Sequence, residues 1–387
     1  MIDLTQSNYA IVSDEAYRFT EAGQLMTPAL IIYPEMVESN IAATISLLGG
    51  DVNRWRPHIK TSKLEWVMRR LVNHGVVNFK CATTLELITA CQAGARDILI
   101  AYPVVGANAR RVAEIMREYP GVRFSVLVEN EFQAKTWEGK SIDIFIDINP
   151  GMNRTGIEQT NVDQVLALAN QVSALGLSLR GVHYYDGHLG GTELVERETI
   201  AHQGYDQLMQ IISQLEDAGF DLPEVITAGT PSLPCSLSYE GFLNTPFVHR
   251  VSPGTIVYSD YTSLAQLPRS YGFKPAALVL ATVVSHPNQS TYTCDAGHKA
   301  VSADAGVPTC AVMGHPTWKP MKPSEEHLPI EVSSGDAPNI GDLIYLLPRH
   351  VCPTVNNFND AVLVANGHLM ELATVTARGR EQKVVSG

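Results

Sequence analysis

The most constraining feature of this chain is an alternation between residues 28 and 255, in which a short apolar run and a polar turn precede each helical segment. Strands that alternate with helices are typical of parallel sheets covered by helices. The runs are ALIIYP, WRPHIK, VNFKCAT, DILIAYP, RFSVLVEN, DIFIDINP, LRGVHYYDG and EVITAGT. Their number, with a span of about 230 residues, favours a closed parallel (β/α)8 barrel, an α/β fold, over a doubly wound sheet.

After residue 256 the alternation ends, and short apolar runs such as STYTCDAG and DLIYLLP are separated by turns. Asn366 and Gly367 lie between two such runs and predict a hairpin. We therefore expect a second, all-β domain over residues 256–387, with residues 1–27 as a candidate addition to it. The proline- and glycine-rich stretch 307–327 is predicted to be a long loop.

The composition of the chain limits which binding partners and which cellular location are expected. Apolar residues make up 45% of the chain, which indicates well-packed domains. The net charge is −12 and the basic residues are scattered, so we expect neither nucleic acid nor a membrane surface as a partner. The apolar runs are too short to span a bilayer, and a polar start argues against a signal peptide. A cytoplasmic protein with mostly reduced, buried cysteines is the prediction.

In a barrel of this type, reactive groups belong at the carboxyl ends of the strands. Lys60 ends the second run, where partial removal from water would let its amine attack a carbonyl and form a Schiff base. A salt-bridged or solvent-facing lysine is the structural alternative.

Small and hydroxyl-bearing residues follow the last runs. AGTPS, with Gly229 and Thr230, and SPGTIVY, with Gly254 and Thr255, offer backbone N–H groups and hydroxyls for a phosphate. In DINPGMNRTGI, Arg154 supplies a fixed cation at the barrel mouth, unless it only pairs with Asp147.

His350 and Cys352 are the best local signal in the second domain. At positions i and i+2 they share one face of an extended strand, so an imidazole and a thiolate could grip one divalent ion. The alternative is a buried histidine beside a core cysteine.

These motifs together resemble a known family. TPALIIY, RPHIKTSK, DINPGMNRTGI, GVHYYDGH, TAGTPS, SPGT, DAGHKA, SEEHL and RHVCPT occur in the order found in the alanine racemase-like, fold-type III pyridoxal-phosphate enzymes of the D-threonine aldolase and D-serine dehydratase group. The resemblance implies that Lys60 carries the cofactor, Arg154 faces its phenolic oxygen and Tyr185 contacts it. It assigns the phosphate to Gly229, Thr230, Gly254 and Thr255, and a metal beside the substrate's β-hydroxyl to His350 and Cys352.

The resemblance also implies a substrate class and leaves the reaction open. We expect a metal-dependent lyase for small D-amino acids that cleaves D-threonine-like substrates to glycine and an aldehyde. Dehydration of D-serine or 3-hydroxyaspartate is the alternative, followed by a racemase and by a non-catalytic cofactor carrier, which the second domain argues against. A thiolate ligand favours zinc, while manganese or magnesium would suit an oxygen-rich site. A homodimer is expected by analogy.

Two departures from the family pattern matter. Ser62 stands where many relatives have histidine, and Cys352 resembles the dehydratases more than the aldolases. His188, His298, Glu326 and His327 are candidate bases or substrate contacts.

Overall fold

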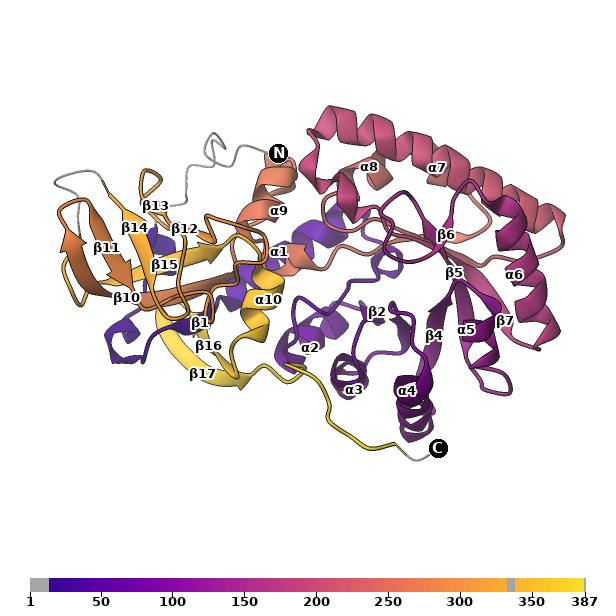
Figure 1. Cartoon of the computed structure of the whole chain (residues 1–387), viewed down its shortest axis with the longest axis horizontal. Coiled ribbons are helices and arrows are strands. Elements are labelled where there is room, and N and C mark those ends of the chain that lie inside the picture. The colour runs from indigo at the N-terminus through magenta and orange to yellow at the C-terminus, as the bar shows by residue number, and fades with distance from the viewer. Residues whose placement is uncertain (1–13, 333–337, 386–387) are drawn as a thin grey trace.

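The computed structural model describes residues 14–332 and 338–385 as two lobes side by side, a helix-covered parallel sheet and a mostly antiparallel β lobe (Figure 1). The parallel strands run in the order β2-β3-β4-β5-β7-β8-β9, with β6 (Ile157–Glu158) beside β5. Their bounds are β2 Asn78–Cys81, β3 Asp97–Ile100, β4 Arg123–Val128, β5 Asp143–Asn149, β7 Ser178–Tyr184, β8 Glu224–Thr227 and β9 Val248–Val251. The predicted alanine racemase-like barrel with a β domain is confirmed.

The barrel is completed by an irregular segment rather than by a strand. Trp55 bridges to Val251 of β9, and His58 bridges to Lys80 of β2. Backbone hydrogen bonds from Arg56 N to Val251 O and from Ile59 N to Lys80 O, both 2.9 Å, join the two edges of the sheet. The run WRPHIK therefore occupies a strand position, as predicted, without regular strand geometry.

The assignment of ALIIYP to the barrel is wrong. This run forms β1 (Ala29–Ile32), which pairs antiparallel with β10 (Ala277–Asn288) and parallel with β16 (Asp360–Ala365) in the second sheet. The missing barrel strand is β9, which the sequence pattern did not reveal. A short apolar run before a helix looks the same in either sheet, because its partner strands β10 and β16 lie far along the chain, as the pairs of Ala29 with Leu280 and of Ile31 with Val362 show.

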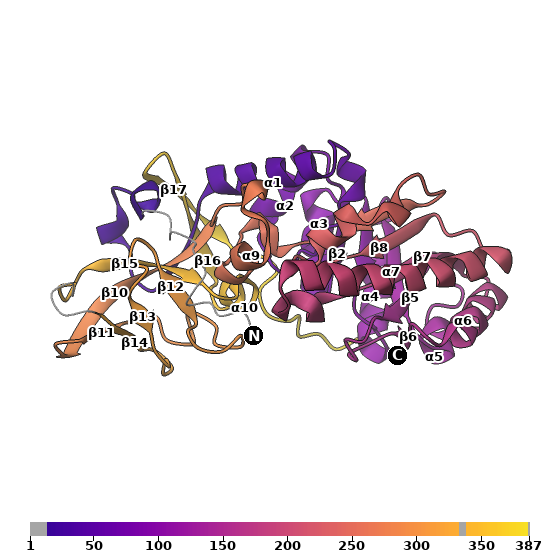
Figure 2. The ribbon, with the colours of Figure 1, turned by 90° about the horizontal axis from the view of Figure 1, so that it is seen from above.

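Helices cover the outer face of the parallel sheet, as the periodicity predicted (Figure 2). The caps of α3 follow local sequence: the Thr83 side chain accepts from Glu86 N at the start of this helix, and Gly94 ends it with φ of 100°. The helices are α1 Pro34–Leu47, α2 Glu65–Asn73, α3 Thr84–Ala93, α4 Gly106–Glu118, α5 Glu131–Lys135, α6 Val162–Ala174, α7 Leu194–Asp217 and α8 Leu233–Ser238. None of the helices in the described ranges has the length and apolar character of a membrane span.

The second lobe is built on β10, the longest strand described. Its other strands are β11 Thr291–Cys294, β12 Cys310–Val312, β13 Lys319–Pro320, β14 Leu328–Glu331, β15 Leu343–Pro348 and β17 His368–Thr374. The hairpin is confirmed, since β16 and β17 pair across Asn366 and Gly367, which have φ of 51° and 74°. The predicted loop 307–327 is only partly a loop, because β12 and β13 lie within it.

The chain crosses between the lobes at both ends. Tyr17 and Phe19 pack into the apolar cluster of the second lobe, which fits the expected addition of the N-terminal segment, although residues 1–13 lie outside the described residues. The C-terminal segment returns along the barrel helices, where Glu381 pairs with Arg111 of α4 (Figure 1). Two short helices, α9 (Tyr261–Gln266) and α10 (Val351–Asn356), lie where the lobes meet.

Candidate active site

A cavity of about 360 Å³ lies at the carboxyl ends of the barrel strands, against the second lobe. Residues from both lobes line it, including every residue that the sequence predicted to bind the cofactor or the metal: Lys60, Arg154, Tyr185, Gly229, Thr230, Gly254, Thr255, His350 and Cys352. The predicted bases His188, His298, Glu326 and His327 are exposed and are not among its lining residues. The amine and the candidate metal ligands thus share one cavity within one chain.

Lys60 enters the cavity because the segment before it is held on both sides by β9 and β2. Its backbone N–H donates to His58 Nδ1 at 3.3 Å, which fixes the turn after the bridging segment. Gly254 lets β9 and its loop approach this segment, since a Cβ at that position would lie 2.2 Å from His58 O. The need for glycine there is therefore steric.

The aromatic ring of Tyr185 is surrounded by cations. Arg154 Cζ lies 5.1 Å from the ring centroid, Lys80 Nζ 5.9 Å and Lys60 Nζ 6.0 Å. Gly229 makes room for this ring, because a Cβ there would lie 2.7 Å from Tyr185 Cε2. Such a ring beside three cations suits a flat, anionic ligand.

Asp147 is not the partner of Arg154 within the described structure, so the structural alternative for this arginine finds no support. The Asp147 carboxylate instead accepts a hydrogen bond from His183 Nδ1 at 2.7 Å. The loop that bears Arg154 is fixed by Asn149, whose Oδ1 accepts from the backbone N–H groups of Gly151 and Asn153, both at 3.0 Å. Arg154 is thereby held at the mouth with its charge available.

One hydroxyl of the site fits a bound phosphate. Ser252 Oγ is buried and has no hydrogen-bond partner among the described residues, although Ser252 lines the cavity. Thr230 and Thr255 line the same cavity. A buried hydroxyl without a partner is costly, so an oxygen-rich ligand would satisfy it. The residues present therefore fit the phosphate of pyridoxal phosphate, and SPGT was the sequence signal for this serine.

His350 and Cys352 lie on a helix start, so their predicted place on an extended strand is wrong. Strand β15 ends at Pro348, and α10 begins at Val351, whose N–H donates to Asp260 Oδ2 at 2.9 Å. Pro353 suits the first turn of a helix, because its missing N–H needs no partner there. The HVCP sequence carried this helix signal.

The imidazole and the thiol nevertheless come together. Burial is the largest influence on the Cys352 thiol and raises its pKa, but the hydrogen bond with His350 and the charges of His350 and Lys60 together outweigh burial and lower that pKa. Cys352 Sγ also lies 3.0 Å from Thr61 Oγ1. His350 Nδ1 donates to Asp304 Oδ2 at 2.7 Å, which leaves Nε2 for a ligand. This nitrogen and sulfur pair, oriented by a carboxylate, fits a divalent ion.

The pair would leave coordination positions open. Across residues 14–332 and 338–385 no group of three histidine, cysteine or acidic side chains converges as a metal site. An ion held by His350 and Cys352 would complete its shell with water or substrate, as catalytic sites do.

Sequence reasoning missed Lys80 and His183. Lys80 lies on β2 and lines the cavity, and its Nζ is 2.8 Å from His183 Nε2 on β7. The available signal was a lysine in the middle of the buried run VNFKCAT, because lysine is rarely buried without a reason.

Comparison with known proteins identifies the family. The alanine racemase N-terminal domain model matches residues 32–262, and the model described as "Putative serine dehydratase domain" matches residues 276–364. The chain belongs to the alanine racemase N-terminal domain family. The resemblance to fold-type III pyridoxal-phosphate enzymes, predicted from the motifs, is thereby confirmed.

Relatives of known activity in this family cover nearly the whole chain. D-threonine aldolase of Arthrobacter sp is 27% identical over 366 residues, 91% of this chain and 93% of the relative. D-threo-3-hydroxyaspartate dehydratase of Delftia sp. (strain HT23) is 24% identical and covers 86% of this chain and 93% of its own length. The crystal structure of D-threonine aldolase from Filomicrobium marinum superposes with a TM-score of 0.84 at 27% identity, covering 92% and 96% of the two chains.

Proposed function

We propose that this chain is a pyridoxal-phosphate- and divalent-metal-dependent lyase that cleaves D-β-hydroxy-α-amino acids of the D-threonine type to glycine and an aldehyde. The observation that carries the proposal is the shared cavity, in which the Lys60 amine and the His350 and Cys352 pair lie together. The aldolase and dehydratase relatives support the lyase class.

The residues have distinct tasks in this proposal. Lys60 carries the cofactor, Arg154 binds its phenolic oxygen, and Tyr185 lies against its ring. The phosphate is held by a group of small and hydroxyl residues: Gly229, Thr230, Ser252, Gly254 and Thr255. Pyridoxal phosphate, when bound, withdraws electrons from the α-carbon of the amino acid. His350 and Cys352 hold the ion, for which thiolate ligation favours zinc, next to the substrate hydroxyl.

The net reaction defines what the protein must do with protons. Cleavage breaks the hydroxyl O–H bond and the Cα–Cβ bond, and it forms a carbonyl and a new Cα–H bond. One proton must therefore be accepted at the hydroxyl and one must be placed on the α-carbon. The ion favours the first transfer because it stabilises negative charge on the oxygen.

Dehydration of D-serine or 3-hydroxy-D-aspartate is the second candidate function. The thiolate ligand Cys352 favours dehydration, since a cysteine at this position is typical of the dehydratases more than of the aldolases. A carrier without catalysis is disfavoured, because His350 and Cys352 of the second lobe line the same cavity as Lys60.

Product analysis separates these functions. Purified protein is supplied with pyridoxal phosphate and zinc, manganese or magnesium, and then incubated with D-threonine, D-serine or 3-hydroxy-D-aspartate. Glycine with an aldehyde supports cleavage, while a keto acid with ammonia supports dehydration. Neither product with any of the metals would contradict both. The homodimer and the cytoplasmic location stay predictions, and light scattering tests the first.

A further inference from the structure

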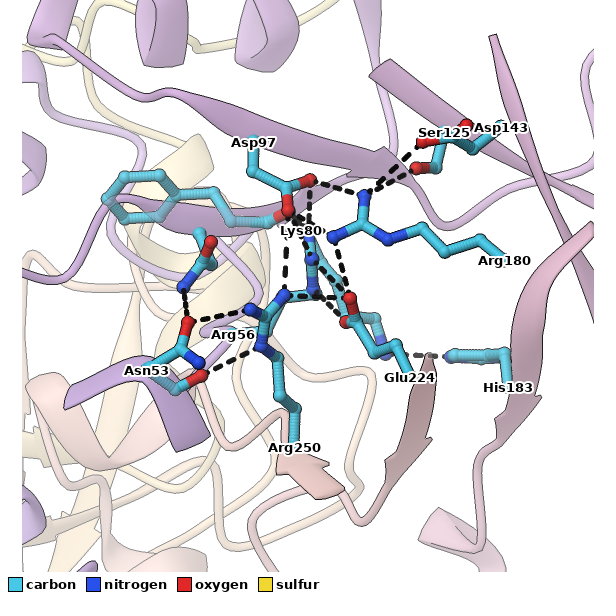
Figure 3. A network of polar contacts seen from close by, with 12 residues as sticks. Asn53, Arg56, Lys80, Asp97, Ser125, Asp143, Arg180, His183, Glu224 and Arg250 are labelled. Atoms are coloured by element: carbon cyan, nitrogen blue, oxygen red, sulfur yellow. Dashed lines mark hydrogen bonds and ion pairs between the residues drawn. The ribbon is translucent and has the colours of Figure 1, made fainter. Parts of the chain in front are cut away.

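A second lysine faces the cavity and is held by a chain of polar side chains inside the barrel. Lys80 is only 3% exposed, and it points from β2 across the barrel toward His183 of β7 (Figure 3). Its Nζ lies 2.8 Å from His183 Nε2, while His183 Nδ1 lies 2.7 Å from Asp147 Oδ1. Three strands thus contribute to one connected row of groups that ends at the cavity.

The direction of the hydrogen bonds along this row follows from the groups. A carboxylate only accepts, so His183 Nδ1 carries a proton and donates it to Asp147. Burial, reinforced by the charge of Lys80, lowers the pKa of His183, so the ring is neutral and its Nε2 accepts from Lys80. One N–H of Lys80 is thereby fixed toward His183, and the rest of the amine is directed to the cavity.

The charges around Lys80 distinguish it from a lysine that only stabilises the fold. Lys63, also buried, pairs with Glu86 at 2.9 Å. Lys80 makes no salt bridge with a carboxylate in the described ranges. The charged and titratable groups that face it from neighbouring elements are Lys60, Asp147, Arg56, Arg154, His183 and His58. Burial and then the charge of Lys60 lower the pKa of Lys80 to about 7.

We propose that Lys80 is a second acid–base amine of this site, which places the proton on the substrate carbon from which the aldehyde leaves, with His183 and Asp147 as its positioning residues. This inference rests on the proposed function for its substrate. In the step, one N–H bond of Lys80 breaks, its electron pair stays on Nζ, and the proton forms the new Cα–H bond. The proton released by the hydroxyl restores the ammonium form, so the cycle balances.

The titration of Lys80 is measured in cofactor-free protein, so that this arm does not depend on activity. Lysines are labelled with ¹³C at Cε, and their NMR shifts are followed with pH. We expect one resonance, absent from Lys80→Met, with a midpoint near 7. Asp147→Asn should move this midpoint lower, because the Asp147 charge favours the protonated amine. If no such resonance titrates below about pH 9, where an ordinary lysine stays charged, the proposal is overturned.

The catalytic arm compares two substitutions at one position. Lys80→Met and Lys80→Arg should each lower turnover of D-threonine by about 100-fold or more, since positioned acid–base groups contribute about 10²–10⁴-fold. Bound cofactor, measured by its visible absorbance, should persist in both. Lys140→Met, an exposed lysine, serves as the matched control.

The arginine variant separates charge from proton transfer. An arginine keeps the positive charge but does not give up its proton, so an active Lys80→Arg enzyme would overturn the proposal. If the unsubstituted enzyme cleaves none of the D-amino acids, the proposed function fails, whereas the NMR midpoint still decides whether Lys80 is an acid–base amine.

Discussion

The two charged layers inside the barrel differ in how completely their charges are paired. Near the amino ends of the strands, the side chains of three arginines and two acids form a closed network (Figure 3). Its ion pairs of 2.7–2.8 Å join Arg56 to Asp97 and Glu224, and Arg180 and Arg250 to Glu224. At the carboxyl ends, Lys60, Lys80 and Arg154 instead surround the Tyr185 ring and a cavity.

This difference separates a structural layer from a functional one. In the layer near the amino ends of the strands, Arg56, Arg180 and Arg250 each already pair with the Glu224 carboxylate, so none of these arginines is left unpaired. The cavity at the mouth is lined by more cations than acids, and one of them, Lys80, is buried without a carboxylate partner in the described ranges, which is costly. Anionic groups of a cofactor and an amino acid would offset that cost. The comparison therefore teaches which charges of the barrel serve binding and which serve folding.

The largest expected effect is the loss of activity when Lys60, at the mouth of the barrel, is replaced. Lys60→Ala should lower lyase activity by roughly 10³-fold or more, because no other described group replaces a nucleophilic amine at that position. The visible absorbance of bound cofactor should disappear while the thermal unfolding midpoint changes little. If Lys60→Ala kept the cofactor absorbance and lost thermal stability, Lys60 would serve folding rather than binding, which would contradict the comparison.

A substitution in the paired layer near the amino ends of the strands should instead lower the stability of the fold. Glu224→Gln leaves the guanidinium groups of Arg56, Arg180 and Arg250 short of a buried charge partner, which should lower the free energy of unfolding by about 3–5 kcal/mol. Chemical denaturation measures this. Arg154→Met at the mouth is the matched control and should cost much less stability. Equal losses in both variants would show that the layers do not differ as described.

The two candidate metal ligands at the mouth, His350 and Cys352, can be tested by one substitution with a large expected effect and one with a smaller effect. Cys352→Ala should abolish activity that added zinc supports, and chelation of the unsubstituted enzyme should do the same. Asp304→Asn, which removes the negative charge that faces His350 Nδ1, should weaken metal affinity by about 10–100-fold. Metal content after dialysis and activity against added zinc give the two values. Unchanged affinity in both variants would exclude these ligands.

The smallest expected effect is a pH dependence of stability. The folded pKa of Lys80 is about 7, whereas lysine in an unfolded chain titrates near 10.4. Between these values the unfolded chain binds more protons, so Lys80 makes the free energy of unfolding rise with pH. Lys80→Met should show a shallower rise from pH 7 to 9 in urea denaturation. Parallel curves for the two proteins would contradict the lowered pKa.

Sequence reasoning found the site better than the strands that carry it. Lys60, His350 and Cys352 were predicted from motifs, and they line one cavity because strand ends and loops converge there. Strand β9 was missed, and β1 was placed in the wrong sheet, because a short apolar run does not specify its partner strand. The roles of the predicted residues stay predictions.

Lys80 and His183 could not be assigned from sequence for a related reason. Each lies within a run that reads as an ordinary buried strand, and 103 positions separate them. Only the closure of the barrel brings β2 opposite β7. Likewise, the turn from β15 into α10 depends on Asp260, a residue distant in sequence whose carboxylate accepts the N–H of Val351.

The most direct measurement of the account is the position of the cofactor on the chain. The protein is loaded with pyridoxal phosphate, treated with borohydride to fix the cofactor to the amine that carries it, digested and analysed by mass spectrometry. The account predicts the label on Lys60, with Lys80 unmodified. A label on Lys80, or no labelled lysine in the cavity, would contradict it.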